Sequence, residues 1–298
     1  MQSRSPSGDQ DGADMPMETR KLSKSIGVEV IGIDLSASID DDSFADIERR
    51  FDENTVVLFR DQRLTPQQHI DFARCFGELE INVMNDYALA SFPEVLVISN
   101  VVENGRQIGL ADAGRNWHTD MSYMPRPPRG SLLYALKVPE KAGRVLGDTL
   151  FVSTAAAYDA LPAETKERLE GLKAIHRSSA RIRNAESRTE RATARGNALP
   201  DVVHPVVRTH PVTGRRSIYV REGECIGIIG MPDEEALPLI RALSDFCIRP
   251  ELMYRHEWRV GDLLMWDNCT AQHLAVNDYE LPLERLMYRV TVNGTVPF

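Results

Sequence analysis

The sequence predicts a mainly β fold, an antiparallel sandwich or jelly roll with flanking helices. Three observations support this prediction: short runs rich in Val, Ile, Leu and aromatic residues recur along the chain, helical patterns are fewer, and strands do not alternate strictly with helices. A doubly wound parallel sheet would need that alternation. The apolar content of 42% in 298 residues is enough for a sizeable core, and barrels and sandwiches of this size are often single units.

The predicted strands are spread over the whole chain. They are residues 28–31, 55–59, 95–98, 132–134, 218–220, 263–266 and 286–292.

Two helices are predicted among these strands. The first follows Thr65 and has proline at its first position. Gln68, three residues after Thr65, gives the spacing of a capping box, and Gly77 is placed to end the helix. The second begins near Asp233. Its predicted buried face consists of Leu237, Ile240, Leu243 and Cys247.

Composition excludes several classes of function. The net charge of −9 argues against generic binding to nucleic acid or to an anionic membrane, because both need a basic surface. No apolar run approaches the length of a membrane span. Residues 1–20 are expected to form a disordered tail rather than a signal peptide, and residues 21–298 a single domain. The four cysteines are scattered, with no Cys-x-x-Cys pair, which favours a reduced, cytoplasmic setting.

The segment at about 177–200 differs from the rest of the chain, with six arginines and few large apolar residues. Such a segment can be a lid insert over a site or a solvated surface helix, and composition leaves both open.

A metal site is predicted from three residues. On an extended strand, the side chains of His118 and Asp120 point to the same side while Thr119 points away. His273, arriving from a distant segment, completes a set of two imidazoles and one carboxylate. This is the ligand set of non-haem Fe(II) oxygenases, which leaves one face of the metal open. An isolated His-x-Asp is also common in loops, so the motif needs support from the rest of the chain.

Two arginines near the end of the chain add to this pattern. On a strand, Arg285, Met287 and Arg289 share one face. Two arginines that face into a barrel are costly unless each meets an anion, whereas on a solvent face they would be free. Beside a metal site, a planar guanidinium is suited to binding acidic ligands bidentately.

The sequence resembles the taurine dioxygenase / 2,4-dichlorophenoxyacetate dioxygenase (TauD/TfdA) family of Fe(II)- and 2-oxoglutarate-dependent oxygenases. The resemblance covers nearly all of the chain from about Lys24 to Phe298. The segments that carry it are 27–35, 72–77, 117–120, 147–149, 204–211 and 266–268, together with His273, Arg285 and Arg289.

This resemblance implies a double-stranded β-helix, a cupin-like jelly roll, in which His118, Asp120 and His273 bind Fe(II). It also implies that Thr149 and Arg285 bind the distal carboxylate of 2-oxoglutarate, since a hydroxyl and a guanidinium both donate hydrogen bonds to a carboxylate. The 2-oxo acid end would chelate the iron and leave one position for O2. Oxidative decarboxylation would then release succinate and CO2 and oxidise a C–H bond of the substrate.

The resemblance assigns Arg289 to the anionic group of a small organic substrate, a carboxylate or a sulfonate. An arginine that is paired inside the barrel is the alternative. Asn82 and Tyr123 are further candidates for the substrate pocket, although ordinary packing explains such residues equally well. Family members are often dimers or tetramers, so a homo-oligomer is expected.

Taurine is not the expected substrate, because the sequence departs from the taurine-specific pattern. Taurine-specific members carry His and Tyr where this chain has Asn82 and Asn85, asparagine where it has Gly114, and phenylalanine where it has Ser178.

Other functions remain open at this point. One is a multi-step oxidation of an amino-acid-derived acid in a biosynthetic pathway. A zinc-dependent hydrolase or a non-catalytic binding protein on the same fold are others, because two histidines and a carboxylate also bind Zn²⁺. The presence of Thr149 and Arg285 argues against a hydrolase, which has no need to bind a 2-oxo acid.

Overall fold

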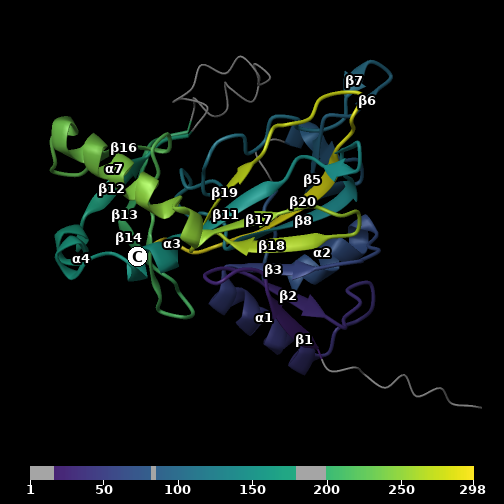
Figure 1. Cartoon of the computed structure of the whole chain (residues 1–298), viewed down its shortest axis with the longest axis horizontal. Helices are drawn as coiled ribbons and strands as arrows, with labels where there is room; N and C mark the ends of the chain where they lie inside the picture. Colours follow the sequence, from purple (N-terminus) through teal and green to yellow (C-terminus); the bar gives the residue numbers. More distant parts are fainter. Residues whose placement is uncertain (1–16, 82–84, 179–198) are drawn as a thin grey trace, which may run out of the picture.

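The computed structural model describes residues 17–81, 85–178 and 199–298, and it has the predicted mainly β architecture (Figure 1). In these ranges the largest sheet has eight strands. In spatial order they are β1 (Glu18–Lys21), β2 (Val28–Ile31), β3 (Val56–Phe59), β18 (Leu263–Asp267), β8 (Gly130–Lys137), β20 (Leu286–Val292), β5 (Phe92–Ser99) and β4 (Ala88–Leu89). Neighbouring strands are antiparallel except for β2 and β3, which are parallel.

A second sheet, three-stranded in the described ranges, packs against the large one to form the jelly roll. Its strands in spatial order are β17 (Met253–His256), β11 (Thr149–Ser153) and β19 (Ala271–Ala275). The core between the two sheets contains Phe151 from the smaller sheet and Leu133, Trp266 and Met287 from the larger one. The candidate metal ligand His273 lies on β19, at the edge of this core.

The remaining strands form smaller sheets and hairpins. They are β13 (Val202–Pro205), β12 (Lys173–His176) and β16 (Cys225–Ile228) in one sheet, and the pairs β14 (Val207–Thr209) with β15 (Arg216–Ile218), β6 (Val102–Glu103) with β7 (Arg106–Gln107), and β9 (Glu140–Lys141) with β10 (Arg144–Val145).

Helices cover the jelly roll in two groups (Figure 1). Helices α1 (Asp41–Asn54) and α2 (Pro66–Arg74) pack on the outer face of the large sheet, where Ile47, Phe51 and Phe72 are buried in a second core. Helix α7 (Asp233–Cys247) lies with the β13–β12–β16 sheet at one end of the molecule. The other helical segments are α3 (Thr154–Asp159), α4 (Ala163–Leu169) and the 3-10 turns η1 (Asn85–Tyr87) and η2 (Pro250–Leu252).

Both predicted helices are present, with small differences. The capping box of α2 is confirmed, because Thr65 accepts a hydrogen bond from the Gln68 N–H at 3.3 Å and Gln68 accepts one from the Thr65 N–H at 2.9 Å. The helix ends at Arg74, however, before Gly77. On α7 the prediction that Leu237 is buried is wrong. It is 45% exposed and Ala236 is buried instead, since positions 236, 240, 243 and 247 keep the spacing of one helix face.

Each predicted strand overlaps a strand of the structure. The bounds of 28–31 and 286–292 are as predicted, and the other strands shift at one end or both. Of the predicted strand 218–220, Ile218 is the last residue of β15, and beyond it the N–H of Tyr219 still donates to the carbonyl of Val206 at 2.8 Å. Residues 18–20, assigned from the sequence to the N-terminal tail, belong to β1. This strand pairs along its whole length with β2, and Arg20 forms an ion pair with Glu29.

Most of the expected insert at 177–200 lies outside the described residues, as does Asn82. At the base of that insert Arg177 forms an ion pair with Asp201, with 2.6 Å between Nη2 and Oδ2. None of the helices in the described ranges combines the length and the apolar character that a membrane crossing needs.

Candidate metal and co-substrate site

The structure brings His118, Asp120 and His273 together as the sequence predicted. Their ligand atoms lie within 4.8 Å of one another, although the two histidines come from distant parts of the chain. The Nε2 atoms of His118 and His273 lie 3.6 and 4.0 Å from Oδ1 of Asp120. His118 does not lie on a long strand. It makes an isolated antiparallel bridge with His273, through backbone hydrogen bonds of 3.1 and 3.0 Å, and the chain turns at Asp120.

A chain of buried side chains sets the orientation of Asp120. Ser131 on β8 donates to Oδ2 at 2.7 Å, so Oδ1 is the oxygen turned toward the imidazoles. Asn268 contacts the Ser131 hydroxyl at 3.4 Å and accepts a hydrogen bond from the Trp266 ring at 3.1 Å. The Trp-Asp-Asn segment therefore supports the carboxylate from behind, an arrangement that commonly fixes metal ligands.

Each imidazole is held with Nε2 facing Asp120. Nδ1 of His118 lies 2.8 Å from the carbonyl oxygen of Asn116, which can only accept, so the proton is on Nδ1 and Nε2 has a free lone pair. The His273 ring is held by packing, stacked on Phe151 at 5.7 Å and tilted against Trp266 at 4.7 Å between ring centroids. Both rings therefore present Nε2 toward the same point.

The protonation states at this point suit a divalent metal. Burial by itself would raise the pKa of Asp120, but Arg289 and the two imidazoles hold it well below its usual value. Burial, followed by the charge on His118, holds the pKa of His273 well below its ordinary range. Burial, the largest single effect, disfavours a charged His118, yet the hydrogen bond to Asp120 and the charges of Asp120 and Glu224 together outweigh it and raise the pKa. Asp120 is thus ionised and His273 neutral at neutral pH, the forms in which each side chain can bind a metal.

Thr149 and Arg285 lie further along the inner face of the barrel. Thr149 is opposite Ala275, and Phe151 is opposite His273, so Thr149 lies two residues, about 7 Å, along the strand from the metal-side pair and on the same face. Its hydroxyl accepts a hydrogen bond from the ring N–H of Trp258 at 3.0 Å and keeps its own proton to donate.

Arg285 is a buried cation with no acid beside it in the described part of the chain. It is 4% exposed, its Nε has no hydrogen-bond partner, and its guanidinium lies 5.8 Å from the centre of the Trp258 ring. Burial lowers its pKa, and contact with Tyr279 works in the opposite direction. A buried guanidinium is costly unless an anion joins it, so this position fits a carboxylate.

Arg289 lies on β20 at the metal side of the site, and Arg285 directly precedes this strand. The Nη1 of Arg289 donates to Oδ1 of Asp120 at 3.2 Å, and its Nε has no hydrogen-bond partner among the described residues. Arg289 lies four residues from Arg285, so the two guanidinium groups mark two ends of the site. The internal pairing that the sequence left open for Arg289 is thus present, with Asp120 as the acid.

The other predicted site residues are less informative. Tyr123 is partly buried in the turn that follows Asp120, and its contact with a substrate stays a prediction. Asn82 lies outside the described residues. The sequence did not single out Ser131, Trp258 or Glu224, which support the site. Ser131 directly precedes a predicted strand, and nothing in the sequence marks Trp258 or Glu224.

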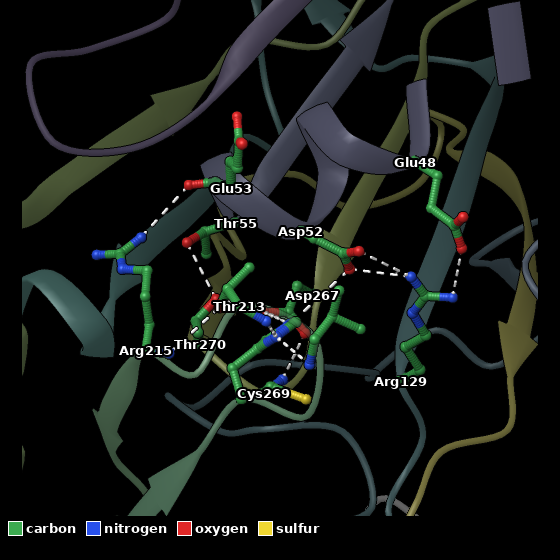
Figure 2. A network of polar contacts seen from close by, with 12 residues as sticks. Glu48, Asp52, Glu53, Thr55, Arg129, Thr213, Arg215, Asp267, Cys269 and Thr270 are labelled. Atoms are coloured by element: carbon green, nitrogen blue, oxygen red, sulfur yellow. Dashed lines mark hydrogen bonds and ion pairs between the residues drawn. The ribbon is translucent and has the colours of Figure 1, made fainter. Parts of the chain in front are cut away.

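A second group of ligand-type side chains, His210, Asp267 and Cys269, is buried beneath the turn that precedes β19. Nδ1 of His210 accepts two backbone N–H groups, at 3.2 and 3.1 Å, so the ring proton is on Nε2. Nε2 lies 3.5 Å from Asp267 and 3.8 Å from Asp52, and it has no lone pair to offer a metal. This group is therefore a structural network that ties the turn to α1, where Asp52 also contacts Arg129 (Figure 2).

Comparison with known proteins agrees with this geometry. A family model described as "Taurine catabolism dioxygenase TauD, TfdA family" matches residues 18–291. The chain belongs to this family. It is 36% identical over 269 residues to the alpha-ketoglutarate-dependent 2,4-dichlorophenoxyacetate dioxygenase of Cupriavidus pinatubonensis, a match that covers 87% of this chain and 91% of the relative.

Two further similarities support the same family membership. The (S)-phenoxypropionate/alpha-ketoglutarate-dioxygenase of Sphingobium herbicidovorans is 31% identical over 288 residues, which is 92% of each chain. The crystal structure of AAD-2 in complex with Mn(II) and N-oxalylglycine superposes with a TM-score of 0.78 at 30% identity, and covers 95% of this chain and 99% of that one. N-oxalylglycine is an analogue of 2-oxoglutarate.

The chain is therefore an Fe(II)- and 2-oxoglutarate-dependent dioxygenase, and its relatives act on small organic anions. The alternatives of a zinc hydrolase and of a non-catalytic binding protein are set aside by this membership. The predicted jelly roll and the predicted co-substrate and O2 requirements are confirmed.

Proposed function

We propose that His118, Asp120 and His273 bind the Fe(II) of this dioxygenase through Nε2, Oδ1 and Nε2. Three findings support this assignment: the three atoms converge, Ser131 holds the other carboxylate oxygen, and the Asn116 carbonyl holds the other nitrogen of His118. The bound metal supplies the activation of O2 and the oxidation of the substrate C–H bond. The protein supplies the ligands in their deprotonated forms and keeps one face of the site open.

We propose that Arg285 and Thr149 bind the distal carboxylate of 2-oxoglutarate. The observation that supports this proposal is the buried guanidinium of Arg285, which forms no ion pair with an acid in the described ranges and whose Nε has no hydrogen-bond partner there. Thr149 lies on the inner face about two residues along from the metal-side pair, a separation that a five-carbon dicarboxylate can bridge. In this arrangement the 2-oxo acid end reaches the metal, while the far carboxylate neutralises Arg285.

Arg289 is proposed to hold the anionic group of the substrate, a small organic carboxylate or sulfonate. Its guanidinium has five N–H groups, and the contact with Asp120 occupies only part of them. An anion held there lies beside the metal, so that a nearby C–H bond of the substrate is presented for oxidation. In this proposal the Arg289 guanidinium contacts the metal ligand Asp120 with one N–H group and the anionic group of the substrate with others.

Taurine is proposed not to be the substrate. At Gly114 the backbone has φ of 74°, and a Cβ there would lie 3.3 Å from Cε1 of His118 and 3.5 Å from Cβ of Ala275. A side chain at this position would adopt a backbone conformation that favours glycine and would crowd the His118 ring. Gly114 therefore lacks the side-chain amide that taurine-specific members have at this position, and the His118 ring leaves little room for such a side chain.

The wider predictions keep their status as predictions. They are a cytoplasmic location, a homo-oligomeric state as a dimer or tetramer, no nucleic-acid partner, and, as the second candidate, a multi-step oxidation of an amino-acid-derived acid.

The proposal is tested by succinate release from the Fe(II)-loaded protein with 2-oxoglutarate under air. The substrate panel contains aryloxyalkanoates, alkylsulfonates, sulfate esters, and free and N-substituted amino acids, with taurine as the negative control. Stimulation by one class of anion identifies the group that Arg289 holds. If uncharged analogues stimulated succinate release as strongly as the anions do, the proposed role of Arg289 would be contradicted. Strong stimulation by taurine would contradict the argument from Gly114.

A further inference from the structure

Glu224 is a buried carboxylate next to the metal-binding loop, in the turn that precedes β16. It is 6% exposed, and its Oε2 accepts the backbone N–H of Thr119 at 3.2 Å. Thr119 is the residue between His118 and Asp120. The contact joins two parts of the chain that are 105 residues apart.

The N–H of Thr119 belongs to the peptide unit that leaves His118. Fixing that N–H fixes the plane of the peptide, and with it the direction in which the chain proceeds to Asp120. The hydroxyl of Thr119 donates to the carbonyl of Ala271 at 3.2 Å, so the residue is held at its amide and at its side chain. Beyond Asp120 the chain turns sharply, with Met121 at φ of 50°. The placement of Asp120 relative to His118 therefore depends on how Thr119 is held.

Glu224 is itself firmly placed. Its N–H donates to the carbonyl of Arg221 at 3.1 Å, and its carbonyl accepts the N–H of Arg177 at 2.9 Å. These two bonds fix the main chain of Glu224, and burial restricts the side chain that reaches from it to Thr119.

The residue type at position 224 is costly for stability. Burial raises the pKa of Glu224 to about 7, against the opposing effects of His118 and the Thr119 amide. Within the described ranges Glu224 forms no ion pair, and it is not among the converging ligand atoms of the metal site. An apolar residue of similar size would avoid the cost of burying a carboxyl group, but it would leave the buried N–H of Thr119 without an acceptor.

We propose that Glu224 is a positioning residue for the metal site: by accepting the N–H of Thr119, it sets His118 and Asp120 in the relative geometry that binds the metal. This inference rests on the proposed metal site and adds to it a supporting residue outside the ligand set. Supporting hydrogen bonds of this kind affect metal affinity by about 10- to 100-fold.

The test compares Mn(II) affinity in metal-free protein, without 2-oxoglutarate, by titration with detection of free Mn(II) by electron paramagnetic resonance. Glu224→Leu removes the acceptor, and Glu224→Gln keeps an acceptor oxygen at the same reach. Glu222→Gln is the matched control, because Glu222 lies in the same turn but is half-exposed and pairs with Arg241 at 2.8 Å. Ile47→Val, a core change in α1, controls for a general loss of stability, since such changes cost about 0.5–1.5 kcal/mol.

We expect Glu224→Leu to weaken Mn(II) binding by about 10- to 100-fold. Glu224→Gln, Glu222→Gln and Ile47→Val should stay close to the wild type. Equal affinity in folded Glu224→Leu would overturn the inference, and so would an equal loss in Glu224→Gln, because charge rather than the hydrogen bond would then matter. If the leucine variant does not fold, Glu224→Asp serves instead: it withdraws the acceptor by one methylene and should bind Mn(II) more weakly than Glu224→Gln. Absence of Mn(II) binding in the wild type would reject the metal site itself, a failure distinct from the others.

Discussion

The Nη1 atom of Arg289 lies 3.2 Å from Oδ1 of Asp120, the same oxygen that faces the Nε2 atoms of both candidate histidines. This cation lowers the pKa of Asp120 and balances its charge inside the barrel. In the proposed site a divalent metal bound to Oδ1 would take over that balancing role. The guanidinium would then be available to an incoming anion, so that one arginine would connect the proposed metal ligand to substrate recognition.

Replacing Arg289 by alanine should therefore affect the substrate far more than the co-substrate. We expect the KM for the anionic substrate to rise by about 10- to 150-fold, the range for losing a charged hydrogen-bonding partner, while the KM for the co-substrate changes little. Mn(II) affinity should be unchanged or higher, because the variant lacks a positive charge next to Asp120. Steady-state kinetics with both compounds varied would check this, and an equal rise in both KM values would mean that the roles of Arg285 and Arg289 are confused.

The complementary prediction concerns Thr149. Thr149→Val keeps the shape of the side chain but removes both the hydrogen bond donated to the co-substrate and the acceptor of the Trp258 ring N–H. The loss of the donated bond should raise the KM for the co-substrate by about 2- to 12-fold, corresponding to about 0.5–1.5 kcal/mol. Arg285→Lys keeps the charge but loses the planar fork, and it should raise that KM further. The KM for the substrate should hardly change in either variant. A rise confined to the substrate would place 2-oxoglutarate elsewhere in the site.

His273→Ala should abolish iron-dependent succinate formation. The substitution removes one of three protein ligands and leaves Oδ1 of Asp120 with a single imidazole partner. Succinate is measured with and without added Fe(II), and bound iron is measured in the same samples. Full activity with bound iron in this variant would contradict the metal assignment.

The sequence was sufficient to predict which side chains converge at the proposed metal site, because their signal is local or strongly patterned. His118 and Asp120 are two residues apart, and the family resemblance covers His273, Thr149 and Arg285 in order along the chain. The described structure brings each of these residues to the inner side of the jelly roll.

What could not be predicted depends on packing between distant segments. Glu224 meets Thr119 across 105 residues, and Trp258 meets Thr149 across 109, so neither contact leaves a pattern in the sequence.

The wrong prediction for Leu237 has another cause. Leu237 and Ala236 lie about 100° apart around the helix axis. Which of the two faces of α7 is buried depends on how the helix packs against the rest of the molecule. The alanine is buried there, whereas hydrophobicity alone favoured the leucine.

His69 on α2 gives a prediction for pH. It is fully buried, its ring packs edge-on against Tyr134 at 6.0 Å between centroids, and burial lowers its pKa from 6.5 to about 3, with a smaller opposing effect from the backbone of Leu132. The unfolded chain takes up a proton near pH 6.5, whereas the folded chain does so only near pH 3. The free energy of unfolding therefore falls as the pH drops below 6.5, by about 2 kcal/mol at pH 5 from this residue.

His69→Leu removes this titration, so its effect on stability should depend on pH. Relative to the wild type, the metal-free variant should gain about 2 kcal/mol in the free energy of unfolding between pH 7.5 and pH 5, measured by urea unfolding. Ile70→Val is the control, because Ile70 is a buried neighbour on the same helix that does not titrate, and its effect should be the same at both pH values. If His69→Leu also shows a constant difference from the wild type, His69 keeps an ordinary pKa in the folded protein, and its burial is not the cause of acid sensitivity.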